Sequence, residues 1–353
     1  MKMKALIAFA VGTLLYVSAL AADKPTVVIL ATGGTIAGAG TSASSNAYTA
    51  GEVTINTLIA SVHGVDKLAN LKFDQVANIP SQDMNDEVWL KLAASAQKYL
   101  DDDSVNGIVI THGTDTMEET AFFLNLVLKT NKPVIVTGSM RPSTAISADG
   151  PINLYNSVAV AGSEQAKGLG VLIVMNDRIY DARDCTKTNT STCDTFASPN
   201  TGSIGFVDFG NIRIYKSPLR KHTMDSEFNI KDITALPKVD IVYEYENGDN
   251  DLMKAAASNP DVKGIVVAGV GDGNLFRTDF TPLKDARTKN GVAIVMSSKV
   301  GSGCVWKNSE MENDKLQFNT ADTLNPAKAR VLLRVILTKT NDYNKIEEVF
   351  NTY

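Results

Sequence analysis

The sequence predicts an α/β fold, with a larger N-terminal domain built on a mostly parallel sheet flanked by helices and a smaller C-terminal α/β domain. Short runs of continuous rather than alternating apolar residues recur along the chain, which is typical of strands buried on both faces of a parallel sheet. Helical patterns lie between these runs, and such alternation indicates α/β architecture. The length of 353 residues, with 44% hydrophobic residues, is sufficient for two domains.

The strands and helices are expected in the order in which their patterns occur. The first half holds the strand-like runs "TVVIL", "GIVITHG", "PVIVTGS" and "GVLIVMND", and the second half holds "VDIVYEY", "GIVVAGVG" and "VAIVMSS". Apolar residues at helical spacing predict helices over 86–100 and 117–128. Near the end, Asn325 as N-cap and Pro326 at the first helical position predict a helix over 325–339, and "NKIEEVF" predicts another.

The first residues have the pattern of a secretory signal. Lys2 and Lys4 precede the apolar stretch "ALIAFAVGTLLYVSALA", which includes small residues at Ala19 and Ala21 and predicts cleavage near Ala21. An uncleaved anchor helix is the alternative, because the stretch approaches the roughly 20 residues that a membrane span needs. Between the two halves, a polar segment with two prolines and little periodicity is interpreted as a linker. The predicted division is a signal peptide at 1–21, an N-terminal domain at 22–211, a linker at 212–238 and a C-terminal domain at 239–353.

Charge and cysteine content narrow the class of partner. Without residues 1–21 the chain has 32 basic and 39 acidic side chains, a net charge of −7, which argues against nucleic acid and anionic membranes as partners. Cys185, Cys193 and Cys304 have no metal-site spacing. In an oxidising compartment Cys185 and Cys193 can close the short loop "CTKTNTSTC", and two unpaired thiols are the alternative.

Polar residues follow four predicted strands at the point where each strand ends. The clusters are "ATGGT", "THGTD", "GSMRPS" and "NDR", and the carboxyl ends of strands in an open α/β sheet line one ligand-binding crevice. We therefore expect four segments to converge on one pocket. The glycines of the first cluster lack dinucleotide and P-loop spacing, so nucleotide binding is not expected. There is no G-x-S-x-G elbow, and His63, His112 and His222 are too scattered to suggest a metal site.

The pocket is expected to be rich in hydroxyl groups. A threonine hydroxyl is a weak nucleophile until a base takes its proton, and a lysine held neutral can be that base, with a carboxylate to orient it. Thr114, Asp115 and Lys187 can form such a relay, while glycines around Thr35 allow backbone N–H groups to approach a reacting carbonyl. The hydroxyl residues near these segments are Thr35, Tyr48, Ser81 and Thr114.

The same residues also admit a structural interpretation. Asp115 lies three residues before Glu118, and Thr116 lies three residues before Glu119. Both pairs have the spacing of capping boxes at the start of a helix. Spacing alone leaves the relay and the capping boxes as alternatives.

At these motifs the chain resembles the bacterial type II L-asparaginase family, secreted amidohydrolases that include glutaminase-asparaginases. The two signature segments are "ILATGGTIAG" and "GIVITHGTDTMEET". Further matches follow in order as "IPSQDMND", "MRPSTAISADGPINLYN", "IVMNDR", "TKTNTST", "AGVGDGN" and "LNPAKARVLL". The resemblance spans essentially the whole mature chain.

The resemblance implies a site, a substrate and an assembly. It implies hydrolysis of L-asparagine, with L-glutamine as a second substrate, in a periplasmic homotetramer that needs no metal or organic cofactor. It places the nucleophile on Thr35, and a site shared between neighbouring subunits through the second domain. The implied catalytic residues are Thr35, Tyr48, Thr114, Asp115 and Lys187, and the implied substrate-binding residues are Ser81, Gln82, Thr114, Asp115, Asn274 and Glu310.

A small zwitterionic amide suits these residues chemically. Asp115 and Glu310 can pair with an α-ammonium group, and Ser81 can receive the α-carboxylate. The chain departs from many relatives at Asp272, which adds a negative charge near the expected subunit interface. The rival class is a secreted solute-binding protein for polar amino acids, which would use Asp115 and Ser81 but would not need Thr35.

Overall fold

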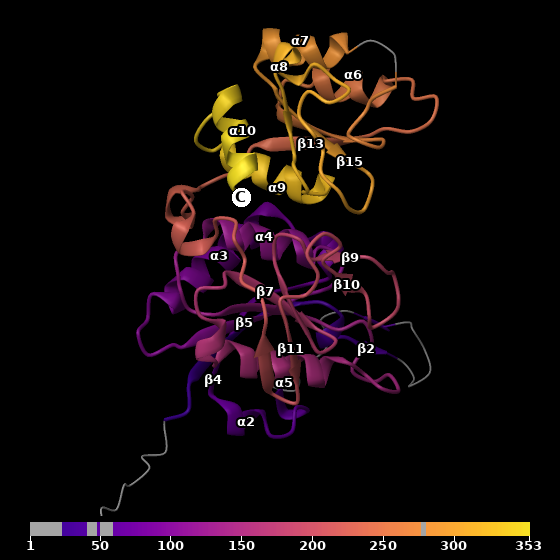
Figure 1. The fold of residues 1–353 in the computed structure, drawn as a ribbon. Coiled ribbons are helices and arrows are strands. Elements are labelled where there is room, and N and C mark those ends of the chain that lie inside the picture. The colour runs from indigo at the N-terminus through magenta and orange to yellow at the C-terminus, as the bar shows by residue number, and fades with distance from the viewer. Residues whose placement is uncertain (1–22, 41–47, 50–58, 277–279) are drawn as a thin grey trace, which may run out of the picture.

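A computed structural model describes residues 23–40, 48–49, 59–276 and 280–353 of the chain. The proposed signal peptide at 1–21 lies outside these residues. Figure 1 shows a larger domain in the lower half of the view, formed by the first part of the chain, and a smaller domain above it. In the described residues, no helix combines the length and the apolar character needed to cross a membrane.

The larger domain is built on an eight-stranded sheet in the order β12-β11-β8-β7-β6-β5-β1-β4. The five strands from β7 to β4 are parallel, and β8, β11 and β12 are antiparallel additions. Every residue of β5, β6 and β7 is buried, as continuous apolar runs predict. The strands are β1 Thr26–Gly33, β4 Asn70–Ile79, β5 Gly107–Thr111, β6 Val134–Thr137, β7 Val171–Met175, β8 Arg178–Asp181, β11 Gly205–Asp208 and β12 Asn211–Ile214.

Helices cover both faces of this sheet (Figure 1). The helices α3 (Asp86–Leu100) and α4 (Met117–Val127) pack on the face that carries Val28, Ile108 and Val136. The opposite face packs on α5 (Gly150–Ala161) and on α2 (Val65–Leu68). Consecutive strand residues alternate between the two cores, which explains why the strands read as unbroken apolar runs.

Four strands of the large sheet, β4, β8, β11 and β12, carry no continuous apolar run. Asn176 and Asp177 adopt positive φ angles of 50° and 60°, and this tight turn folds β7 back into β8. The edge strand β4 has mostly exposed or half-buried residues, so its sequence lacks the apolar run of a central strand. The strand β12 extends to Ile214, so residue 211, the predicted end of the first domain, is the first residue of this strand.

The smaller domain has a parallel sheet in the order β13-β14-β15-β16. One face packs on α6 and α7, and the other packs on α9, which also lies against α4 of the larger domain. The helix α9 is therefore shared by the cores of both domains. The elements are β13 Lys238–Tyr243, β14 Val262–Gly269, β15 Ala293–Ser298, β16 Phe318–Thr320, α6 Asp251–Ser258, α7 Thr281–Asn290, α8 Asn313–Leu316, α9 Pro326–Ile336 and α10 Tyr343–Thr352.

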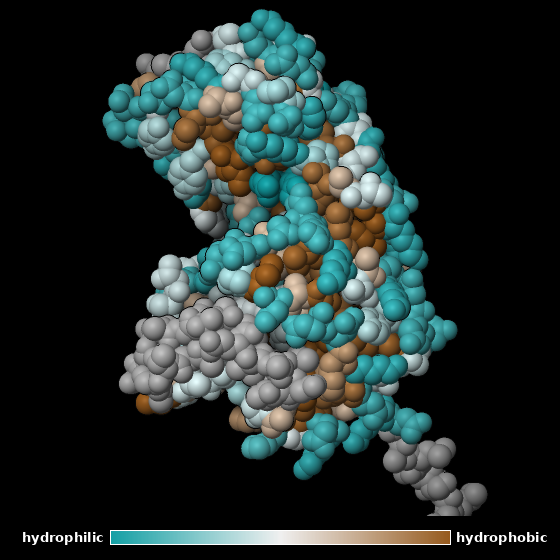
Figure 2. Space-filling model, turned by 180° about the vertical axis from the view of Figure 1, so that it is seen from behind, coloured by the Kyte–Doolittle hydropathy of each residue, from teal (hydrophilic) through white to brown (hydrophobic). Residues whose placement is uncertain are grey.

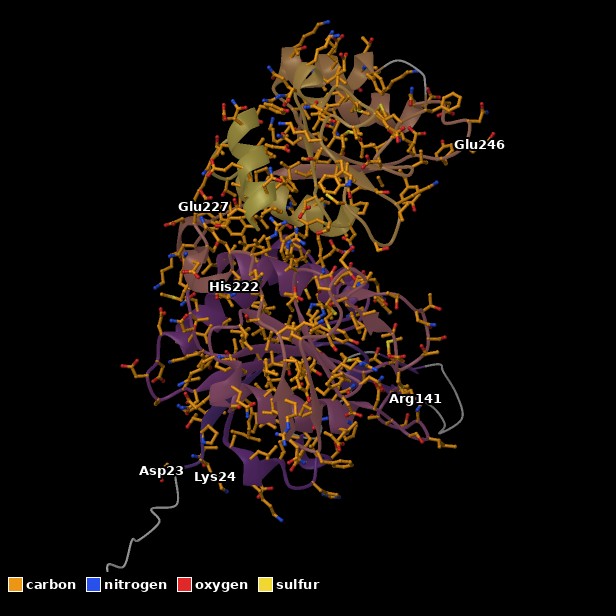
Figure 3. All side chains as sticks on the ribbon, viewed as in Figure 1. Asp23, Lys24, Arg141, His222, Glu227 and Glu246 are labelled. Atoms are coloured by element: carbon orange, nitrogen blue, oxygen red, sulfur yellow. The ribbon has the colours of Figure 1, made fainter. Side chains whose placement is uncertain are left out.

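Two small ribbons stand beside the large sheet, on one side of the molecule. They are β2 (Ala39–Gly40) with β3 (Tyr48–Thr49), and β9 (Thr186–Lys187) with β10 (Phe196–Ala197). Seen from behind, the surface is hollowed between the two domains on this side (Figure 2). Arg141 of the larger domain and Glu246 of the smaller domain both stand on the side of this hollow (Figure 3).

Candidate active site

The loop after β1 is shaped by two glycines. Gly33 and Gly34 have φ angles of +108° and +85°, which side chains other than glycine rarely adopt. A Cβ atom on Gly34 would lie 2.4 Å from the backbone N of Gly113, so only glycine allows the loop after β1 to contact the loop after β5. Thr35 follows at once, in a short 3-10 helix (Thr35–Ala37), and is 6% exposed.

The loop after β5 and the ribbon strand β9 bring a lysine to a threonine. Lys187 Nζ donates to Thr114 Oγ1 at 2.9 Å and forms an ion pair with Asp115 Oδ1 at 2.6 Å. Thr114 is buried, whereas the Asp115 side chain is 57% exposed. The lysine therefore connects a protected hydroxyl to a carboxylate that a ligand can reach.

A third segment, after β4, meets the loop after β1 and the loop after β5. Ser81 is buried, and its Oγ accepts a hydrogen bond from Asp115 N at 3.1 Å. A Cβ atom on Gly113 would lie 2.5 Å from Ser81 Oγ, so a second glycine is needed for close packing. Gln82 is the next residue and is exposed. The segments after β4, β1 and β5 thus meet at one edge of the sheet, where parallel strands end.

The capping-box interpretation is wrong for both residue pairs. The N-cap of α4 is Thr116, but its side chain caps no helical N–H group and instead donates from Oγ1 to Ser81 O at 2.7 Å. The carboxylate of Glu118 accepts hydrogen bonds from the neighbouring ribbon, namely from Thr186 Oγ1 at 2.5 Å and from Lys187 N at 2.6 Å. Sequence reasoning therefore missed a role of Glu118 in holding β9.

Two implied substrate-binding residues lie in the smaller domain. Asn274 Nδ2 donates to Glu310 Oε2 at 3.0 Å. Asp272 stabilises the segment that carries Glu310, because its carboxylate accepts hydrogen bonds from Trp306 N at 2.8 Å and from Ser309 Oγ at 2.5 Å. Within the described ranges, no hydrogen bond or ion pair joins this group to the Lys187 relay.

Tyr48 is only partly described. Its backbone pairs with Gly40 between β2 and β3, and its side chain lies outside the described part of the structure. The position of its hydroxyl relative to Thr35 therefore stays a prediction.

The histidine beside the relay is structural. His112 is fully buried, and its Nδ1 hydrogen-bonds Gly113 O at 2.6 Å. Burial lowers the pKa of His112 to about 4, since a charged imidazolium would lose its hydration. Its Nε2 has no partner among the described residues. A histidine enclosed in this way cannot exchange protons with a substrate in the crevice.

The hypothesised bond between Cys185 and Cys193 is not formed, because both are free thiols. Cys185 is fully buried in the core of the larger domain, and burial raises the pKa of its thiol well above the usual value. Cys193 lies in the loop between β9 and β10. The ribbon of β9 and β10, which carries Lys187, is therefore held by other contacts.

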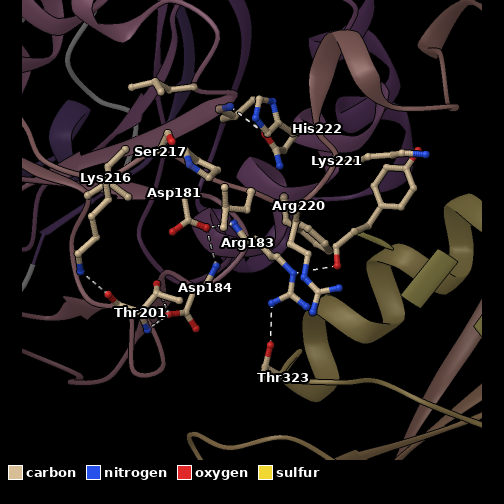
Figure 4. A pocket seen from close by; sticks show the side chains of 18 of the residues that line it. Asp181, Arg183, Asp184, Thr201, Lys216, Ser217, Arg220, Lys221, His222 and Thr323 are labelled. Atoms are coloured by element: carbon tan, nitrogen blue, oxygen red, sulfur yellow. Dashed lines mark hydrogen bonds between the residues drawn. The ribbon is translucent and has the colours of Figure 1, made fainter. Parts of the chain in front are cut away.

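A cavity of about 540 Å³ lies elsewhere, between the segment 216–222 and the larger domain (Figure 4). Three of its cationic side chains are already engaged. Arg183 and Arg220 donate to Asp322 Oδ2 at 2.8 and 2.7 Å, and Lys216 Nζ donates to Thr201 O at 2.6 Å. The described site residues do not line this cavity, which lies where the larger domain meets Asp322 of the smaller domain.

Known families and proteins match this architecture. The family described as "Asparaginase, N-terminal" matches residues 26–220, and the family described as "Glutaminase/Asparaginase C-terminal domain" matches residues 238–350. The chain belongs to the asparaginase family. The matched asparaginase regions hold all of the predicted site residues, from Thr35 to Glu310.

Individual asparaginases resemble the chain over nearly its whole length. L-asparaginase 2 of Escherichia coli is 49% identical, covering 95% of each chain. Glutaminase-asparaginase of Pseudomonas fluorescens is also 49% identical, over 93% of this chain and 90% of the relative. A crystal structure of a probable cytoplasmic L-asparaginase from Campylobacter jejuni has a TM-score of 0.90 and 45% identity, covering 94% of this chain and 100% of that chain.

Proposed function

We propose that this chain is an L-asparaginase, which hydrolyses L-asparagine to L-aspartate and ammonia and accepts L-glutamine as a second substrate. The observation that carries the proposal is the contact of Lys187 Nζ with both Thr114 Oγ1 and Asp115 Oδ1, beside the loop that holds Thr35. Membership of the asparaginase family supports it, and the relatives give no support to a solute-binding protein.

The reaction is an acyl transfer in two steps. Thr35 Oγ attacks the carboxamide carbon while Tyr48 assists removal of the hydroxyl proton, the C–N bond breaks, and the nitrogen leaves as ammonia after taking up a proton. This forms an ester between the aspartyl group and Thr35. Water then attacks the ester, its proton passes through the relay of Thr114 and Lys187, and the ester oxygen of Thr35 is reprotonated as aspartate leaves.

Charged groups of the substrate have suitable partners. The exposed carboxylate of Asp115 can pair with the α-ammonium group. Ser81 Oγ already accepts the Asp115 N–H group, so its own proton is available to a carboxylate oxygen of the substrate. Gln82 lies next to it, and Asn274 with Glu310 would approach from a neighbouring subunit. This chemistry requires no metal or organic cofactor.

We propose a homotetramer in the periplasm, reached through the signal at 1–21. The pattern of Lys2, the apolar stretch and Ala21 supports export. A relative from Haemophilus influenzae, 47% identical over 94% of each chain, is named "Probable L-asparaginase periplasmic", whereas the Campylobacter jejuni structure is described as cytoplasmic. The mass of the protein recovered from a periplasmic extract tests both export and cleavage.

Ammonia release tests the enzymatic function. We expect the purified protein to release ammonia from L-asparagine and, more slowly, from L-glutamine, because one extra methylene changes discrimination by about 1–3 kcal/mol in a simple pocket. Tight binding of either amino acid without ammonia release would establish the solute-binding alternative instead.

Single substitutions test the assigned roles. We expect Thr35→Ala and Lys187→Met each to abolish turnover while substrate binding, measured by calorimetry, is largely retained. Thr35→Ala removes the attacking oxygen, and Lys187→Met removes the nitrogen of the proton relay while keeping an unbranched side chain. A Thr35→Ala variant with wild-type rates would exclude Thr35 as the nucleophile.

A further inference from the structure

A buried lysine of the smaller domain binds the segment that leads to Lys187. Lys328, in the first turn of α9, is 1% exposed. Its Nζ donates to the carbonyl oxygens of Ala182 at 2.9 Å and Arg183 at 2.8 Å, and also to that of Cys185. Burial of an ammonium group is costly unless its donors are satisfied, and these carbonyls engage all three. The lysine therefore fixes the backbone of this segment.

The ribbon strand β9 is held at the next residues by Glu118 of α4. While Glu118 Oε2 accepts the bonds from Thr186 and Lys187 given above, its Oε1 accepts from Asn325 Nδ2 at 2.9 Å. Asn325 is also the N-cap of α9, because its Oδ1 accepts from Lys328 N at 2.9 Å. The start of α9 is therefore connected to the backbone of Lys187 along two routes, one through Lys328 and one through Glu118.

A further contact from the smaller domain reaches the same segment. The Arg183 side chain donates to Thr323 Oγ1 at 2.7 Å, to Asp322 Oδ2 at 2.8 Å and to Tyr353 O at 2.8 Å, and Figure 4 shows Arg183 beside Thr323. The segment before Lys187 is thus held from the smaller domain, while the lysine side chain itself extends to Thr114 of the larger domain.

We propose that Lys328 and Glu118 are positioning residues, which set the place of the Lys187 ammonium group against Thr114. In this arrangement the smaller domain completes the relay of its own chain. Neither side chain hydrogen-bonds Thr114 or Asp115 in the described part of the structure, so both act through the backbone of Lys187. The proposal rests on the function proposed above.

Steady-state kinetics of asparagine hydrolysis by the full chain test the proposal. Lys328→Met removes the ammonium group and keeps the apolar stem, and Thr186→Val removes the hydroxyl donated to Glu118. Since misplacement of a catalytic group by 1 Å can cost about 10²-fold in rate, we expect kcat to fall about 10²-fold in Lys328→Met and about 10-fold in Thr186→Val. KM should stay within about twofold of the wild-type value, and Thr186→Ser, which keeps the hydroxyl, should restore kcat.

Lys132→Met is the matched control. Lys132 Nζ also donates to two backbone carbonyls, those of Leu100 at 2.9 Å and Asp102 at 2.7 Å, but these carbonyls lie outside the segment that leads to Lys187. We expect its kcat to be unchanged. An equal loss of kcat in Lys132→Met and Lys328→Met would mean that the loss comes from general destabilisation of the protein, and it would overturn the proposal.

Lys187→Met separates this proposal from the proposed function. Wild-type turnover in Lys187→Met would overturn the relay itself. Inactive Lys187→Met together with unchanged kcat in Lys328→Met and Thr186→Val would overturn the positioning role alone. If Lys328→Met does not fold, the two Thr186 variants test the proposal instead. Equal kcat in Thr186→Val and Thr186→Ser would contradict the role of Glu118.

Discussion

The imidazole of His112 lies two residues before Thr114 and couples the stability of the site to pH. Its pKa of about 4 in the folded protein, caused by burial, lies below the ordinary value of 6.5. Above pH 6.5 the ring is neutral in both states, and between pH 6.5 and 4 the unfolded chain takes up the proton first. The free energy of unfolding is therefore larger at neutral pH than at pH 4 by about 3 kcal/mol, and this difference is lost as the pH falls towards 4.

Urea unfolding at pH 7 and pH 4 measures this contribution. Between pH 7 and pH 4 the free energy of unfolding should fall by about 3 kcal/mol less in His112→Gln than in the wild type. All measurements use one protein concentration, because assembly also affects stability. His63→Gln replaces an exposed imidazole and is the control. Equal pH dependence in His112→Gln and wild type would show that the buried ring is not the group responsible.

Among the elements, the turn after β1 determines whether the Thr35 loop can contact the loop after β5. Gly34→Ala would place a Cβ atom 2.4 Å from Gly113 N, so the two loops must separate, and we expect kcat to fall about 10²-fold. Gly168→Ala is the control, because Gly168 also has a positive φ of +71° but nothing within 4 Å of the added atom. The kcat of both variants is measured once circular dichroism has shown that each keeps the wild-type fold. A wild-type kcat in Gly34→Ala would contradict the role of this close packing.

The elements also show what the sequence could and could not predict. The seven apolar runs became β1, β5, β6, β7, β13, β14 and β15. In all of these strands except β13, which is partly exposed, burial on both faces leaves a pattern that does not depend on neighbours. The strand β4 was missed because an edge strand exposes much of its surface. Glu118 was assigned to a cap, since its partners Thr186, Lys187 and Asn325 lie 68, 69 and 207 residues away and no local spacing encodes such contacts.

At the scale of the whole molecule, the sequence predicts the site residues one by one but not how they assemble. Lys187, Thr114 and Asp115 meet within one chain because the ribbon strand β9 brings Lys187 to the loop after β5. Asn274 and Glu310 instead form a separate pair in the smaller domain. Under the proposed function a single chain holds two half-sites, and the proposed assembly would join the first half of one subunit to the second half of its neighbour.

Mixing two inactive variants tests this assembly. Thr35→Ala damages only the first half-site and Glu310→Ala only the second, so a mixed pair of subunits contains one site with both defects and one intact site. After joint unfolding and refolding of equal amounts, random pairing should restore about a quarter of the wild-type ammonia release. Thr35→Ala mixed with Lys187→Met is the control and should restore none, because both defects lie in the first half-site. Equal absence of activity in the two mixtures would mean that each chain builds its site alone, with Glu310 serving the site of its own chain.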